Sequence, residues 1–195
     1  RGFANPLIFR SVQQSRMLMT INPAQSSSQT FSVSERKFRI GLIGCGLRGA
    51  GYLHYLLKDA RNFELVAVAD PQQKYREFAA SKFSESRART FACGRELLTQ
   101  TELDAVVIAS PNAAHRADAV LALQQGVTTL LEKPVATTQQ DLAAIWQART
   151  GSVADVVVGF VLRYTPFYRA IAEILRSGLL GKILVINAEE LMSDR

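Results

Sequence analysis

From Lys37 onward, short apolar runs alternate with longer segments in which apolar residues recur every three or four positions. Short apolar runs are typical of strands buried on both faces of a sheet, and the longer segments are typical of helices that cover it. Strands are predicted at 39–44, 64–70, 89–92, 103–110, 128–133 and 155–161. Helices are predicted at 49–60, 71–83, 94–101, 112–126, 139–151 and 165–181. This alternation indicates an α/β fold with a doubly wound parallel sheet.

Proline, glycine and threonine mark the ends of several predicted helices. Pro71 is expected at the first position of one helix and Pro166 near the start of another, because proline is tolerated in the first turn. Gly126 is expected to end the helix before it. Thr137 or Thr138 can cap the helix that follows.

The predicted elements divide the chain into three parts. Residues 1–36 form a tail, 37–160 form one domain, and 161–195 form a linker helix and the start of a second domain. A further strand is predicted at 182–191, and no partner strand follows it in the chain. We therefore expect a truncated chain that contains only the first strand of a second, α+β domain.

The tail is rich in Ser, Gln and Asn and poor in acidic residues. This composition favours disorder, because little apolar surface is available for burial. Two alternatives share the composition. One is an organelle-targeting peptide, and the other is translated upstream sequence with Met17 or Met19 as the true start.

Composition excludes several classes of function. The net charge is +6, of which +4 falls within residues 1–37, so the folded part carries no basic surface of the kind that binds nucleic acid. No apolar run reaches the roughly 18–20 residues of a membrane span. Cys45 and Cys93 have no metal-like spacing, and with only His54 and His115 beside them no metal site is expected. Two reduced thiols favour a cytoplasmic protein.

The most informative stretch is GLIGCGLRGAGY at 41–52, which has five glycines in twelve residues. Gly44, Gly46 and Gly49 form a G-x-G-x-x-G element between a strand and a helix. In a Rossmann fold the first glycine permits a tight turn, the second leaves room for a pyrophosphate, and the third lets helix and strand pack closely. Alone the motif is weak, since a glycine-rich turn can serve packing only.

Asp70 strengthens this interpretation, because it ends the next strand, 21 residues after Gly49. An acid at this place binds the ribose 2′-hydroxyl of NAD and repels the 2′-phosphate of NADP. NAD is therefore the expected cofactor. NADP is a less favoured alternative, because Arg48 and Lys74 are close in sequence. Asp70 could also cap the helix that begins at the Pro71 turn.

Two other strand ends should lie at the same edge of the sheet. One carries Ser110, Pro111 and Asn112, with His115 one helical turn further on, and the other carries Glu132 and Lys133 followed by Pro134. Ligands of open parallel sheets bind beyond the carboxyl ends of the strands. These segments are therefore expected to flank the nicotinamide half of the cofactor.

From about Lys37 to its last residue the chain resembles the Gfo/Idh/MocA family of NAD(P)-dependent oxidoreductases. The resemblance rests on GLIGCGLRGAGY, VAVADP, DAVVIASPNAAH, LLEKPVATT and VGFVLRYTPFYRAIAEILRSGLLGKI. It implies hydride transfer between the nicotinamide and a hydroxyl of a sugar, cyclitol or related polyol. It also implies a homo-oligomer for the full-length protein and a second domain that holds further catalytic residues.

The resemblance assigns roles to individual residues. It implies that Lys133 is catalytic, lying against the nicotinamide and the substrate hydroxyl, and that the bond before Pro134 is cis. It makes Asn112 and His115 candidate cofactor contacts and places Arg163, with less weight, near the active site. The remaining expected cofactor contacts are Gly44, Cys45, Gly46, Leu47, Arg48, Asp70, Ser110, Pro111, Glu132 and Lys133.

Two other functions stay open. Some members of the resembled family use NAD transiently in a glycosidase or lyase reaction with no net redox change. A truncated chain could also bind the dinucleotide without catalysing any reaction.

Overall fold

A computed structural model describes residues 36–59, 62–83 and 88–189. The predicted tail at 1–36 therefore lies outside the described residues except for its last position. Within the described part, the predicted strands and helices of the first domain all appear, with boundaries that differ by a few residues.

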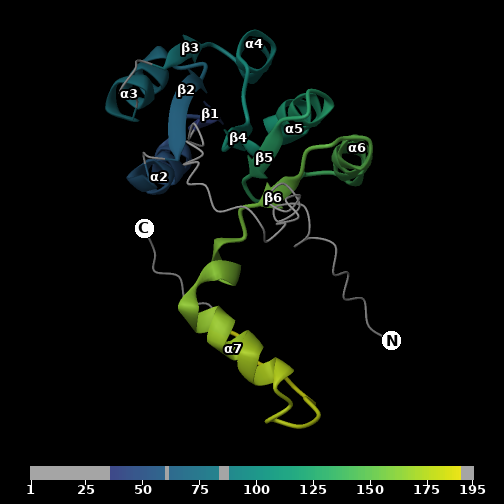
Figure 1. The fold of residues 1–195 in the computed structure, drawn as a ribbon. Coiled ribbons are helices and arrows are strands. Elements are labelled where there is room, and N and C mark those ends of the chain that lie inside the picture. Colours follow the sequence, from purple (N-terminus) through teal and green to yellow (C-terminus); the bar gives the residue numbers. More distant parts are fainter. Residues whose placement is uncertain (1–35, 60–61, 84–87, 190–195) are drawn as a thin grey trace, which may run out of the picture. The chain divides into compact units, whose positions relative to one another are not determined.

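Six parallel strands form a single sheet in the order β3-β2-β1-β4-β5-β6 (Figure 1). Their bounds are β1 Phe38–Ile43, β2 Phe63–Ala69, β3 Arg89–Phe91, β4 Ala105–Ile108, β5 Thr128–Leu131 and β6 Val156–Val158. Strand order reverses between β1 and β4, because the chain moves outward from β1 to β3 and then returns to add β4 on the other side. The doubly wound parallel sheet predicted from the sequence is confirmed.

Helices cover both faces of this sheet. They are α2 (Leu47–Leu56), α3 (Gln73–Phe83), α4 (Gly94–Gln100), α5 (His115–Gln124) and α6 (Gln139–Thr150). Short 3-10 turns, η2 (Leu57–Asp59) and η3 (Asn112–Ala114), follow α2 and precede α5.

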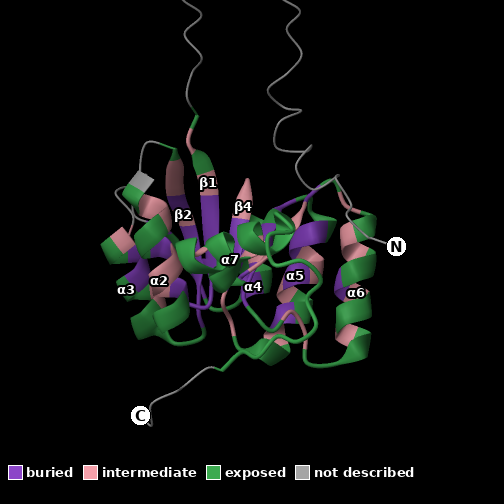
Figure 2. Ribbon diagram, turned by 90° about the horizontal axis from the view of Figure 1, so that it is seen from below, coloured by how far each residue is buried: buried purple, intermediate pink, exposed green. Residues whose placement is uncertain are grey.

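Two buried clusters hold these layers together. Leu53 of α2 and Ala79 of α3 pack with Leu42 and Val68 on one face of the sheet. Leu97 of α4, Leu123 of α5 and Ile145 of α6 belong to the cluster on the other face. Figure 2 shows the buried residues along the strands and on the sheet-facing sides of the helices.

The helix-end predictions have mixed outcomes. Thr138 caps α6, since its hydroxyl accepts a hydrogen bond from the Asp141 N–H at 3.1 Å. Gly126 adopts φ +73° directly after α5, as a helix-ending glycine should. The prediction for Pro71 is wrong, because α3 begins two residues later at Gln73. The Asp70 carboxylate explains the delay: it accepts a hydrogen bond from the Gln72 N–H at 2.8 Å and so forms a separate turn before the helix.

After β6 the chain forms a 3-10 turn, η4 (Val161–Tyr164), and a helix, α7 (Pro166–Arg176), which begins at the expected proline. No residue of α7 is buried. The strand predicted at 182–191 is absent from 182–189, the part of it that the structure describes. A strand is stabilised by hydrogen bonds to a neighbour, and residues 182–189 pair with no strand among the described residues.

Candidate functional site

The residues that follow five of the strands lie in one row at the carboxyl edge of the sheet. Ile43 pairs with Ile108, which pairs with Leu131, which in turn pairs with Val158. On the other side, Ile43 pairs with Ala69. The hydrogen-bond ladder continues one residue further, from the N–H groups of Gly44, Asp70, Ala109, Glu132 and Gly159 to the last carbonyls of neighbouring strands at 2.8–3.2 Å. The predicted glycine loop, the acid and the EKP segment are therefore neighbours in space.

The three motif glycines have different physical roles. Gly44 has φ +88°, and a Cβ there would lie 2.5 Å from the main chain of Ala109 and Ser110. A Cβ on Gly49 would lie 2.0 Å from the Gly44 carbonyl oxygen, so close packing of helix and turn requires glycine. A Cβ on Gly46 would meet no atom within 4 Å. Packing explains the first and third glycines, and it does not explain the second.

Gly46 is also the N-cap of α2, and no side chain caps this helix. The first N–H groups of a helix have no partner within the helix and carry the positive end of its dipole. The N-terminus of α2 therefore provides hydrogen-bond donors beside an open backbone, an arrangement that suits a pyrophosphate.

Asp70 is 9% exposed and is tied to the glycine loop. Its Oδ2 accepts a hydrogen bond from the Cys45 N–H at 2.9 Å, and its Oδ1 accepts the bond from Gln72 described above. Arg76 donates to the Asp70 carbonyl oxygen at 3.0 Å. The carboxylate thus holds the loop in place, and each of its oxygens has a second lone pair for a further donor. It is not the cap of α3, because that helix begins later.

Cys45 contributes its backbone to this loop, and its thiol is buried. Burial raises the pKa of the Cys45 thiol to about 12, and the Asp70 charge adds to the effect. The thiol stays protonated at neutral pH and is unsuited to nucleophilic chemistry.

Glu132 connects the glycine-loop helix to the EKP segment. This buried carboxylate pairs with Arg48 at 3.2 Å and accepts hydrogen bonds from the Tyr52 hydroxyl at 2.8 Å and the Lys133 N–H at 2.7 Å. Burial raises the pKa of Tyr52 to about 12, and the Glu132 interaction adds to it. A Cβ on Gly159 would lie 2.5 Å from the Tyr52 hydroxyl oxygen, so the contact requires glycine after β6.

Tyr52 and Gly159 were not predicted as site residues. The spacing of Arg48 and Tyr52, four residues apart on a helix, places them on one face and could have indicated a shared partner. Nothing in the sequence points from Gly159 to Tyr52, since the contact depends on how α2 packs against the sheet and on where the residue after β6 lies.

Lys133 is exposed at the sheet edge, and the peptide bond between Lys133 and Pro134 is cis, as the resemblance implied. Glu132 fixes the main-chain N–H of Lys133, so the backbone that carries the side chain has a defined position.

The sequence placed His115 among the cofactor contacts, but its ring is fully buried. Nδ1 lies 2.7 Å from the Pro134 carbonyl oxygen, and Nε2 lies 2.9 Å from the Ser110 carbonyl oxygen. Both polar atoms of the ring are therefore engaged by the protein backbone. The structure places His115 behind the edge of the sheet, between the two loops that were expected to flank the nicotinamide.

Asp118 lies in the same region and was not predicted. Its Oδ2 accepts a hydrogen bond from the Ser110 hydroxyl at 3.0 Å. Burial raises the pKa of Asp118, while the Ser110 hydrogen bond and the nearby His115 act in the opposite direction.

The remaining predicted residues lie on the surface. Leu47 is 91% exposed at the start of α2, and Pro111 and Asn112 are exposed before α5. Arg163 is exposed in η4, with its guanidinium 5.4 Å from the centre of the Phe160 ring. Its position gives no contact to the predicted site residues in the described part of the chain.

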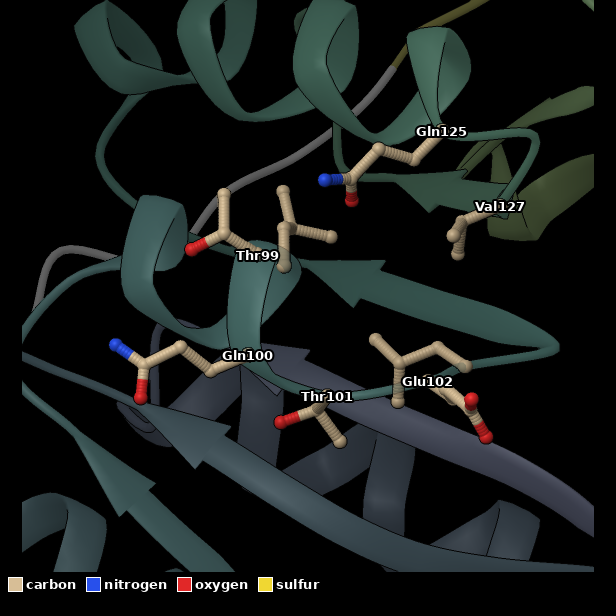
Figure 3. Close-up of a pocket in the computed structure, with 8 residues that line it drawn as sticks. Thr99, Gln100, Thr101, Glu102, Gln125 and Val127 are labelled. Carbon is tan, nitrogen blue, oxygen red and sulfur yellow. The ribbon is translucent and has the colours of Figure 1, made fainter.

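A surface hollow of about 490 Å³ lies at the opposite edge of the sheet (Figure 3). Its lining comes from the end of α4, the segment before β4 and the segment before β5: Leu98, Thr99, Gln100, Thr101, Glu102, Leu103, Gln125 and Val127. None of the predicted site residues lines it. Because it borders the amino ends of the strands, it is not the place where ligands of parallel sheets bind.

Comparison with known proteins identifies the family. Residues 38–160 match a family profile, GFO_IDH_MocA, described as an oxidoreductase family with an NAD-binding Rossmann fold. The chain belongs to this family. The expectation drawn from the sequence resemblance is therefore confirmed.

Curated relatives include two bacterial inositol 2-dehydrogenases. Inositol 2-dehydrogenase 2 of Saccharopolyspora erythraea is 33% identical over 150 residues, which are 76% of this chain and 44% of the relative. Inositol 2-dehydrogenase of Acidothermus cellulolyticus is 33% identical over 155 residues, 79% of this chain and 45% of the relative. The chain thus spans a little under half the length of these relatives.

Two solved dehydrogenase structures superpose well on this chain. Myo-inositol dehydrogenase from Lactobacillus casei, in complex with NAD(H) and myo-inositol, has a TM-score of 0.69 and 30% identity over 75% of this chain and 43% of its own. The WlbA dehydrogenase from Bordetella pertussis, in complex with NADH and UDP-GlcNAcA, has a TM-score of 0.69 and 26% identity, covering 75% of this chain and 44% of its own.

The described residues contain neither a helix suited to crossing a membrane nor a cluster suited to binding a metal ion. No helix at 36–59, 62–83 or 88–189 combines the length and apolar content needed to cross a bilayer. No group of three or more His, Cys, Asp or Glu side chains in these ranges is arranged to hold a metal ion.

Proposed function

We propose that this chain binds NAD at the carboxyl edge of its sheet, as the cofactor-binding half of an oxidoreductase. The reaction would move a hydride between the nicotinamide and a hydroxyl-bearing carbon of a cyclitol or sugar. The observation that carries the proposal is the open backbone at Gly46 beside the uncapped N-terminus of α2. A glycine that packing does not require, next to unpaired helix donors, fits a pyrophosphate.

We assign NAD rather than NADP from the charges around the glycine loop. Asp70 stands where a ribose 2′-hydroxyl would be held, and its carboxylate disfavours a 2′-phosphate there. The two basic residues that kept NADP open in the sequence, Arg48 and Lys74, have other contacts in the structure. Arg48 pairs with Glu132 at 3.2 Å, and the Lys74 ammonium lies 4.8 Å from the centre of the Tyr75 ring.

Lys133 is the proposed catalytic residue. Its main chain is fixed by Glu132, and its side chain is exposed at the edge where substrate would approach. There its amino group would hold the substrate hydroxyl. As the neutral amine it would take the hydroxyl proton when the hydride leaves, and as the ammonium it would return that proton in the reverse direction. The nicotinamide, when bound, supplies the hydride chemistry.

A cyclitol substrate is supported by the relatives, which are inositol dehydrogenases. Since the chain spans less than half of their length, the activity, the substrate and the homo-oligomer expected for the whole protein are proposals. Cytoplasmic localisation stays a prediction.

Calorimetric titration of NAD and of NADP into the chain tests the cofactor assignment, with Asp70→Asn as the variant. Asparagine keeps the size of the side chain and removes its charge. We expect the wild type to prefer NAD, and the variant to lose roughly tenfold or more of that preference because a like-charge repulsion has been removed. If Asp70 only holds the loop, the affinities for NAD and for NADP will fall by the same factor and the preference for NAD will stay unchanged. If a folded wild type binds neither dinucleotide, the proposal fails.

The reaction is tested by following NADH absorbance with myo-inositol and NAD. Formation of NADH supports the dehydrogenase. Conversion of a glycoside without net NADH would favour the alternative in which NAD is oxidised and reduced within one cycle. Binding without either reaction would leave the chain as a dinucleotide-binding module.

A further inference from the structure

The hydrogen bonds around His115 determine how many protons its ring carries. Both ring nitrogens lie within hydrogen-bond distance of carbonyl oxygens, at 2.7 and 2.9 Å. A carbonyl oxygen can only accept, and a neutral imidazole has one donor nitrogen and one acceptor nitrogen. In a neutral ring, one of the two contacts would set a nitrogen lone pair against a carbonyl oxygen. Both contacts are favourable only when both nitrogens donate.

A ring with two donors is a cation, and a buried cation needs a counter-charge. Asp118 is placed to supply it, because it lies three residues further along α5 and therefore on the same face of that helix. The carboxylate is enclosed by α4, since a Cβ on Gly94 would lie 2.4 Å from Asp118 Oδ1. The Ser110 hydroxyl donates to its other oxygen.

Other charged groups near α5 have partners of their own or project outward. Asp141, at the start of α6, pairs with Arg116 at 3.4 Å. The side chain of Lys133, after β5, is exposed. Glu132, the buried carboxylate after β5, pairs with Arg48 at 3.2 Å. Asp118 is therefore the carboxylate placed to balance the ring.

The two carbonyl groups belong to different loops at the candidate site. Ser110 lies two residues after β4, and Pro134 directly follows the proposed catalytic lysine, Lys133. The ring bridges the two loops from behind, where no ligand can reach it. We propose that His115 is a positioning residue: a buried imidazolium, balanced by Asp118, that sets the distance between the Ser110 loop and the Lys133–Pro134 turn. This assignment of His115 depends on the proposed function in one respect, namely the identity of the ligand that binds between the two loops.

Nuclear magnetic resonance of the wild-type chain tests the state of the ring directly. Long-range correlation of the carbon-bound ring protons with the ring nitrogens reports whether each nitrogen carries hydrogen. The chain has two histidines, so a His54→Gln variant assigns the signals and the exposed His54 serves as a reference. We expect both nitrogens of His115 to be protonated at neutral pH. An unprotonated nitrogen would overturn the proposal, and this measurement requires neither a variant of His115 nor a bound cofactor.

Binding of NAD and of ADP-ribose, which lacks the nicotinamide, tests the positioning role. In His115→Gln we expect NAD affinity to fall by roughly tenfold, the equivalent of one charge-assisted hydrogen bond. ADP-ribose affinity should stay close to that of the wild type, because both ring nitrogens bond to Ser110 and Pro134 and neither bonds to the glycine loop or to Asp70. Equal loss for both ligands, or no loss for either, would refute positioning at the nicotinamide end. If the wild type binds neither ligand, the proposed function is at fault, and the nitrogen signals alone decide the state of His115.

Discussion

Replacing Gly46 by alanine separates the role of this glycine in binding from any role in folding. Its φ of −67° and ψ of −171° are available to alanine, and the added Cβ would meet no atom within 4 Å. Alanine is the poorer N-cap residue, which costs up to about 1 kcal/mol, and the reduced freedom of the unfolded chain offsets about 0.4–1 kcal/mol of that. The free energy of unfolding should therefore change by less than about 1 kcal/mol.

The effect on NAD binding should be much larger. A methyl group at this place occupies the space through which a pyrophosphate would approach the N-terminus of α2. Hydrogen bonds to a charged group contribute about 1.5–3 kcal/mol each. Loss of two such bonds would lower the affinity for NAD by roughly a hundredfold or more.

Calorimetric titration with NAD, together with thermal melting, is the assay, and Gly51→Ala is the matched control. Gly51 lies within α2 of the same loop–helix unit, and a Cβ there also meets no atom within 4 Å. Alanine in a helix interior stabilises by about 0.5–1 kcal/mol, so the control should melt higher and bind NAD as the wild type does. Wild-type NAD affinity in Gly46→Ala would show that no pyrophosphate approaches this residue, and the main argument for the cofactor site would be lost.

Three further changes test other parts of the structure. Gly44→Ala should lower the free energy of unfolding by roughly 2 kcal/mol or more, because it combines a positive φ with a main-chain clash; a melting temperature equal to that of the wild type would contradict this. In the folded chain a thiol reagent should label the exposed Cys93 quickly and Cys45 only after denaturation, and rapid labelling of both would contradict the buried thiol with its raised pKa. Burial alone would raise the pKa of Asp104, but bonds from the Arg39 N–H and a neighbouring guanidinium bring it below the usual 3.8. The charged Asp104 therefore stabilises the fold at pH values above 3.8, and this stabilisation is lost as the pH falls through the lower pKa of the folded state. Asp104→Asn should flatten the acid end of a curve of unfolding free energy against pH. An unchanged curve would count against the ion pair.

Much of the fold could be predicted because most strands are short apolar runs with helical periodicity on either side. The strand before the glycine loop was placed within one residue of β1, and the acid that follows β2 was placed at the same edge of the sheet. The fixed geometry of parallel strands then brings their carboxyl ends together, so Gly44, Asp70 and Glu132 were identified as neighbours before their contacts were known.

The contacts that depend on helix packing could not be predicted in this way. His115 was assigned to the cofactor from its place in a motif, whereas its burial follows from how α5 packs behind the sheet. Tyr52 reaches Glu132 because of how α2 packs against the sheet, and Gly159 leaves room for the Tyr52 hydroxyl. Residues 182–189 have the apolar pattern of a strand. No strand forms there, because no neighbouring strand among the described residues is available to form hydrogen bonds with them.

The row of residues at the carboxyl edge also determines where this chain can change length. Gly44, Asp70, Glu132 and Gly159 each come directly after a strand, so strand register sets their positions and the lengths of the connections do not. An extra residue in the turn between a helix and the next strand leaves the row intact. An extra residue inside a strand moves its end by about 3.3 Å and turns the following side chains to the opposite face. Insertions should therefore be tolerated in the turns that lead into the strands and rejected in the strands.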